Sequence, residues 1–236
     1  MKKLNWLTAS AAALLAAIVI APPSARADGF LGSAVGSLAG PGAGGAPAAS
    51  PADLSTSLGG LSTTFAASFQ NMLLAESLSA KAFGLKAESE QLEKTAAYYG
   101  KGNIEDYDQV GRDVTVAADT QAKIDQKMAA ATTTDAAAKK QLSAAAPYYA
   151  VGTAHAATLP GQYAAWVARA QATMKSNPVA LASNSGLVTQ VPKVAQLSTR
   201  LPDLTAKWIS VTKGFVTFTH KQKIDTGDLS SKVGEL

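Results

Sequence analysis

Tyrosine side chains form the densest group of residues in this chain that could bind a ligand or take part in chemistry. The phenol combines an apolar ring with a hydroxyl that both donates and accepts hydrogen bonds, which suits a partner surface or a pocket for a partly polar ligand. The six tyrosines are Tyr98, Tyr99, Tyr107, Tyr148, Tyr149 and Tyr163. Whether they can act together depends on the helices that carry them.

The chain is helical in character from about residue 54, because alanine is abundant and Gly and Pro concentrate at likely boundaries. We predict a first helix from Leu61 to Tyr99, stopped by glycines, and a second helix that begins after Asn103. A third runs from the Asp135 cap to about Ala157, with Pro147 kinking or splitting it. Further predicted helices start at residues 158–160 and near residue 202, after an irregular region that opens at residues 177–186.

Apolar residues in the second helix alternate in steps of three and four from Tyr107 to Met128, which is typical of a helix packed against other helices. A continuous first helix would be nearly 60 Å long at ~1.5 Å per residue. We therefore expect a bend near Gly84, or an overhang covered by residues 178–200. Pro202 is expected to divide the last apolar run. The predicted core contains Val114, Ile124, Leu142, Trp166, Leu204 and Trp208.

These elements predict an all-α fold, an antiparallel bundle of about four to six helices with long amphipathic helices, because short turns favour antiparallel neighbours. In such a bundle the helix ending at Tyr99 and the helix starting at Tyr107 meet at one end, and the third helix returns there. Two interpretations stay open, a binding site and an aromatic plug that fills the wider end of the bundle. The candidate binding residues are Tyr99, Tyr107, Tyr149, His155, Tyr163 and Trp166.

Glu76 is the one carboxylate that falls within the apolar stripe of the first helix, among Phe69, Met72 and Phe83. A carboxylate buried there would have a raised pKa and could be functional. Desolvating an unpaired carboxylate is costly, so we expect the stripe to drift and Glu76 to reach the rim of the bundle.

The sequence contains no nucleophile elbow, phosphate-binding loop or zinc-protease motif. It has no cysteine and only two histidines, and neither histidine has a neighbouring pattern of metal ligands. We therefore expect no catalytic residue, no metal and no cofactor.

The first 27 residues are typical of a cleaved export signal, with a basic start at Lys2, an apolar run and an Ala25-Arg26-Ala27 cleavage site. We predict a signal peptide over 1–27, a flexible Gly/Ala/Pro leader over 28–53, a helical-bundle domain over 54–224 and a flexible tail over 225–236. The protein is then exported, to the periplasm or outside the cell. An uncleaved membrane anchor is the alternative for the apolar run.

Removing the signal also removes three basic residues, which leaves 18 basic and 17 acidic residues and argues against nucleic-acid binding. We expect a non-enzymatic binding or interaction module of the cell envelope, whose partner is a protein or a small amphipathic ligand. Two alternatives stay open: a membrane-active protein that uses the Gly32, Gly36 and Gly40 spacing, and an enzyme with Tyr and carboxylate groups at the aromatic end. Peripheral contact with a membrane and the oligomeric state also stay open.

Overall fold

The computed structural model describes residues 48–102, 104, 106–179 and 184–234. This part of the chain is helical and contains no strand, which confirms the all-α prediction. The predicted signal peptide and nearly all of the predicted leader lie outside the described residues. The helices are α2 (Pro51–Ala82), α3 (Lys86–Tyr99), α4 (Tyr107–Ala130), α5 (Ala136–Ser176), α7 (Ser185–Lys221) and α8 (Leu229–Gly234).

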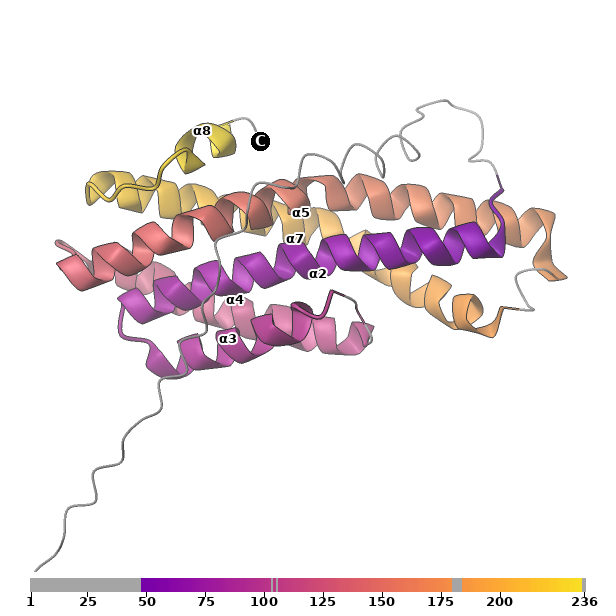
Figure 1. Cartoon of the computed structure of the whole chain (residues 1–236), viewed down its shortest axis with the longest axis horizontal. Helices are drawn as coiled ribbons and strands as arrows, with labels where there is room; N and C mark the ends of the chain where they lie inside the picture. Colours follow the sequence, from indigo (N-terminus) through magenta and orange to yellow (C-terminus); the bar gives the residue numbers. More distant parts are fainter. Residues whose placement is uncertain (1–47, 103, 105, 180–183, 235–236) are drawn as a thin grey trace, which may run out of the picture. The chain divides into compact units, whose positions relative to one another are not determined.

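The predicted first helix is in fact two helices, α2 and α3, which form an antiparallel hairpin (Figure 1). Ser50 caps α2 by accepting a hydrogen bond from the backbone N–H of Asp53 at 3.1 Å, so α2 begins within the segment predicted as leader. The chain reverses at Gly84, whose φ of +74° is a conformation that favours glycine. The expected bend is therefore a complete turn.

Helix α4 follows its predicted pattern, with Val110, Ala117 and Ile124 buried. Its N-cap is Asp106, whose carboxylate accepts from the N–H groups of residues 108 and 109; the predicted cap, Asn103, lies outside the described residues. The predicted cap of the next helix is confirmed, because Asp135 accepts from the N–H of Ala138 at 2.7 Å.

Helix α5 is one continuous helix of 41 residues, so the predicted break at residues 158–160 is wrong. Pro147 and Pro160 both lie inside it, and each removes one backbone hydrogen bond. Pro147 is exposed to water, and the buried carbonyl of Ala156 that Pro160 leaves free accepts a hydrogen bond from the Thr205 hydroxyl at 3.2 Å. Continuous packing along α2 outweighs this local cost. In the same way, packing mainly on α5 lets α7 run through Pro202, and α7 begins at Ser185, well before the predicted start.

The predicted flexible tail contains α8, whose Leu229 and Val233 are buried against the bundle. This difference arises because the apolar pair is spaced by four residues, so one face of a short helix can cover apolar surface.

Side-chain contacts give the direction of each helix. Contacts of α2 with α5 run in opposite order, from Leu54–Trp166 to Ser79–Tyr149, so these two helices are antiparallel. Contacts of α2 with α7 run in the same order, from Phe65–Trp208 to Phe83–Phe218. Helices α2, α4 and α7 therefore share one direction, and α3 and α5 run the opposite way (Figure 1).

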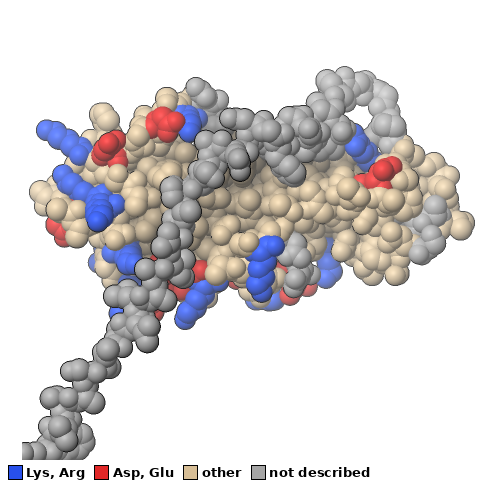
Figure 2. Space-filling view, viewed as in Figure 1, with Lys and Arg blue, Asp and Glu red and all other residues tan. Residues whose placement is uncertain are grey.

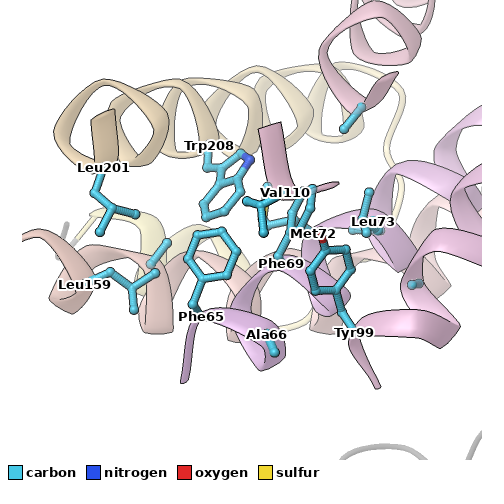
Figure 3. Close-up of a cluster of buried hydrophobic side chains, with 14 of the residues drawn as sticks. Phe65, Ala66, Phe69, Met72, Leu73, Tyr99, Val110, Leu159, Leu201 and Trp208 are labelled. Atoms are coloured by element: carbon cyan, nitrogen blue, oxygen red, sulfur yellow. The ribbon is translucent and has the colours of Figure 1, made fainter. Parts of the chain in front are cut away.

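The centre of the bundle is an aromatic cluster formed by Phe65, Phe69, Tyr99 and Trp208 (Figure 3). Trp208 stacks on Phe69 at 5.6 Å between ring centroids, and Tyr99 meets the other side of Phe69 at 4.7 Å. Of the predicted core, Ile124, Leu142, Trp166 and Trp208 are buried. Val114 and Leu204 are only half-buried, because the adjacent residues Asp113 and Thr205 take the inward positions in those turns.

Candidate functional site

The predicted cluster of tyrosines at one end of the bundle does not form. Because α5 has no break, Tyr149 and Tyr163 are 14 residues apart on one helix, roughly 21 Å at ~1.5 Å per residue. Tyr149 packs against Phe215 near the end of α2, at a ring distance of 4.6 Å. Tyr107 reaches Ser62, nearer the start of α2, with 3.5 Å between the hydroxyl oxygens. The tyrosines are therefore strung along α2.

Four of the six candidate binding residues fill the core. Tyr99, Tyr149, Tyr163 and Trp166 are buried, whereas Tyr107 and His155 are half-buried. The Tyr99 hydroxyl donates to Asp113 at 2.9 Å, and the Trp166 indole N–H donates to the carbonyl of Leu54 at 3.0 Å. These contacts are those of a structural core, spread over several layers rather than gathered as one plug.

Two of the candidates keep polar atoms without partners. The Tyr163 hydroxyl and the His155 Nδ1 are buried and have no hydrogen-bond partner among the described residues. Burial raises the pKa of Tyr163 and lowers the pKa of His155, so both side chains favour their neutral forms. Tyr163 lies near Tyr107, but neither residue lies near Tyr149.

Glu76 is buried, with only 2% of its surface exposed, which makes the predicted position at the rim wrong. Its Oε2 atom has no hydrogen-bond partner among the described residues. Burial, and to a lesser extent the nearby Asp125 carboxylate, raises the pKa of Glu76 to about 8. The sequence signal was present in the three-four spacing of the stripe, which continues through Glu76 without drifting.

The surroundings of Glu76 follow from the helix directions. Phe69 of α2 stacks on Trp208 of α7, and seven residues later these parallel helices present Glu76 and Phe215. The Tyr149 ring packs on Phe215, and the Glu76 carboxylate lies close enough to help raise the pKa of Tyr149. Glu76 therefore lies in the layer next to the aromatic cluster, two helical turns further along α2.

A second unpartnered acceptor belongs to α4. The Oε1 atom of Gln121 is buried without a donor, while its Nε2 donates to Asp125 at 2.7 Å. The carboxylate of Asp125 also acts on Glu76, so it links the two side chains. Within the described residues, no group of three His, Cys, Asp or Glu side chains is arranged to hold a metal ion.

The accessible polar groups lie in a groove between α3 and α4, which sequence reasoning missed. Its volume is about 410 Å³, and its lining residues are Gln91, Lys94, Thr95, Tyr98, Asp106, Gln109 and Asp113. Figure 2 shows charged side chains of both signs along the edge of the bundle that α3 and α4 form. The available signal was the spacing of Gln91, Lys94 and Tyr98, which places them on one face of a helix.

The α4 wall of this groove is internally bonded. Asp113 accepts from the Tyr99 hydroxyl and from Gln109 Nε2 at 2.7 Å, and Asp106 accepts from the backbone at its own cap. The α3 wall is different, because the side chains of Gln91 and Lys94 and the hydroxyl of Tyr98 have no hydrogen-bond or ion-pair partner among the described residues. The free donors therefore all lie on α3.

No helix of the described residues is both long enough and apolar enough to cross a membrane. Comparison of the chain with protein families, with curated proteins and with solved structures finds no match.

Proposed function

We propose that this protein is an exported, non-enzymatic binding module that takes an amphipathic ligand or protein segment into the groove between α3 and α4. The observation that carries the proposal is the set of free groups on the α3 wall, Gln91, Lys94 and Tyr98, beside a groove of about 410 Å³. The Tyr98 ring offers apolar contact, and the Lys94 ammonium offers charge-assisted hydrogen bonds. A ligand with an aromatic or aliphatic face and a carboxylate fits this chemistry.

The burial of the other tyrosines supports binding over catalysis. An enzyme that uses tyrosine side chains would need them to reach a substrate, and the side chains of Tyr99, Tyr149 and Tyr163 are buried in the bundle. Tyr98 is the tyrosine that lines the groove, and its ring is held on one side by Tyr99 at 5.1 Å and by the Lys101 ammonium at 5.6 Å. A ring held in place loses little entropy on binding.

The test compares Lys94→Glu with Lys207→Glu, an exposed lysine of α7 outside the groove. Each protein is purified from its native envelope, and co-purifying molecules are identified by mass spectrometry. We expect a carboxylate-bearing ligand with the wild type and with Lys207→Glu, and its loss with Lys94→Glu. Equal recovery from both variants would exclude the groove as the binding site.

Export has its own test, the intact mass of protein recovered from the envelope fraction. Cleavage after Ala27 predicts a mature chain that begins at Asp28. A species that retains Met1 would contradict cleavage and favour a membrane anchor.

A further inference from the structure

Helix α4 is held on the bundle by a narrow and unusually polar seam. Six of its 24 residues are buried, and half of those six are polar. The buried polar residues are Asp113, Thr120 and Gln121. By contrast, α5 buries 14 residues, nearly all of them apolar or small. Since apolar burial is the main source of docking energy, α4 is the long helix with the weakest hold on the bundle.

Contacts outside the seam add little to this hold. The ion pair between Lys193 and Asp108 spans 3.9 Å and is exposed, and the Lys123–Glu88 pair at 2.8 Å is also largely solvated. Exposed pairs of this kind contribute little to stability, because solvent screens them. The docking of α4 therefore depends on what lies beneath its buried face.

Glu76 lies beneath that face. Tyr107 of α4 meets Ser62 of α2, and the two helices run in the same direction (Figure 1). Fourteen residues further along each helix, Glu76 comes level with Gln121. The action of Asp125 on the Glu76 carboxyl is consistent with this register, because Asp125 lies one turn beyond Gln121.

No described helix around Glu76 offers its anion an opposite charge. Asp125 faces it from α4 and is the one charged group of the described residues that shifts its pKa. The phenol of Tyr149 faces it from α5, and α7 contributes the apolar ring of Phe215 to the same layer. On the side of α3, Glu93 accepts a hydrogen bond from Ser77, which adjoins Glu76. An anion at residue 76 would thus be buried with no cation beside it, with the Asp125 carboxylate nearby and with Oε2 lacking a hydrogen-bond partner among the described residues.

The neutral carboxyl, by contrast, suits the seam. A protonated carboxyl carries an O–H donor, and Gln121 Oε1 is a buried acceptor that lacks one. We propose that the docking of α4 is coupled to the protonation of Glu76, so that α4 is held while this carboxyl is neutral and is released as it ionises.

The direction of the pH dependence follows from the pKa of Glu76, which rises from 4.5 in the unfolded chain to about 8 in the bundle. An acid with a raised pKa stabilises the docked state fully below pH 4.5, and this contribution is lost as the pH rises to about 8. The docking equilibrium of α4 is therefore weakened by up to ~10³-fold over that range.

Release of α4 would also dismantle the groove, because Asp106, Gln109 and Asp113 lie at or on α4 while Lys94 and Tyr98 lie on α3. This consequence, loss of ligand at alkaline pH, rests on the proposed function. The coupling of α4 to Glu76 does not depend on it.

The test is hydrogen exchange of the full chain at pH 5 and pH 8.5, corrected for the intrinsic dependence of exchange on pH. In the wild type we expect the amides of α4 to lose at least tenfold more protection than those of α2 and α5. In Glu76→Gln, a neutral side chain of the same shape, we expect α4 to stay protected at both values. In Asp125→Asn the loss of α4 protection between the two pH values should be smaller than in the wild type, because the Glu76 anion is then less unfavourable.

Three results would overturn the coupling: equal protection of α4 at both pH values in the wild type, an equal loss in Glu76→Gln, or a loss shared evenly by all helices. If Glu76→Gln does not fold, Asp125→Asn supplies the comparison, and a loss equal to that of the wild type then counts against the coupling. Ligand retention measured on the same samples tests the groove separately. If α4 loses protection while the ligand stays bound, the proposed function is contradicted and the coupling remains intact.

Discussion

Gly152 of α5 lies against Met72 of α2 so closely that a Cβ atom at residue 152 would be 3.1 Å from the backbone nitrogen of Met72. The Ser68 hydroxyl donates to the Gly152 carbonyl at 2.8 Å at the same crossing. The space at this position therefore admits only glycine. This crossing sets the distance between α2 and α5, the two helices with the most extensive contact.

Adding one methyl group at this crossing should destabilise the protein. We expect Gly152→Ala to lower the free energy of unfolding by about 1–3 kcal/mol, because the backbone of α2 must shift. The control is Gly161→Ala on the same helix, where a Cβ meets nothing within 4 Å. Alanine is the better helix former, so this change should stabilise by up to about 1 kcal/mol. Urea unfolding measures both, and effects of the same sign would refute the close approach.

Two buried phenols make a second matched pair. Tyr99→Phe removes the donor to the buried Asp113 carboxylate and should cost about 1–3 kcal/mol. Tyr163→Phe removes a buried hydroxyl that has no partner among the described residues, so it should be neutral or stabilising. Thermal unfolding of the two variants ranks them. A larger loss for Tyr163→Phe would show that its hydroxyl has an essential partner.

Shortening single side chains of α4 to alanine distinguishes the inward face of this helix from its flank. Ile124 is completely buried, so Ile124→Ala should cost about 2–4 kcal/mol. Val114 is half-buried, so Val114→Ala should cost less than about 1 kcal/mol. Equal losses in denaturant unfolding would mean that α4 packs through another face.

Glu76 should make global stability depend on pH. At pH 7 the Glu76 carboxyl is mostly neutral in the bundle, whereas it is ionised in the unfolded chain. This difference lowers the free energy of unfolding at pH 7 by roughly 3 kcal/mol. Glu76→Gln should recover much of that amount at pH 7 and change little at pH 4. Glu90→Gln, at an exposed position of α3, serves as the control and should have no effect at either pH. A wild-type stability that rises between pH 4.5 and 8 while Glu76→Gln stays constant would contradict the raised pKa of Glu76.

The parts of the fold that could be predicted are those governed by local chemistry. The spacing of Val110, Ala117 and Ile124 identified the packed face of α4, and Asp135 identified the start of α5. Pro147 and Pro160 led to the wrong topology, because the sequence shows the local cost of a proline and not the packing that outweighs it. The predicted tyrosine cluster failed with that topology.

The candidate site was harder to predict than the fold. Glu76 was visible in the stripe, but whether a carboxylate is buried depends on Asp125, Tyr149 and α4, which are distant in sequence. The groove depends on α3 turning back at Gly84, so that Lys94 and Gln109 come to line the same hollow. Neither relationship is encoded in one segment.

The tight reversal at Gly84 also has a consequence for how the chain folds. Only residues 83–85 separate α2 from α3, so little loop-closure entropy opposes their pairing. Pairing of α2 with α5 brings together residues as far apart as Leu54 and Trp166. The α2–α3 hairpin should therefore form early and serve as a template for the slower arrival of α5, and φ-values near one in the hairpin would report that order.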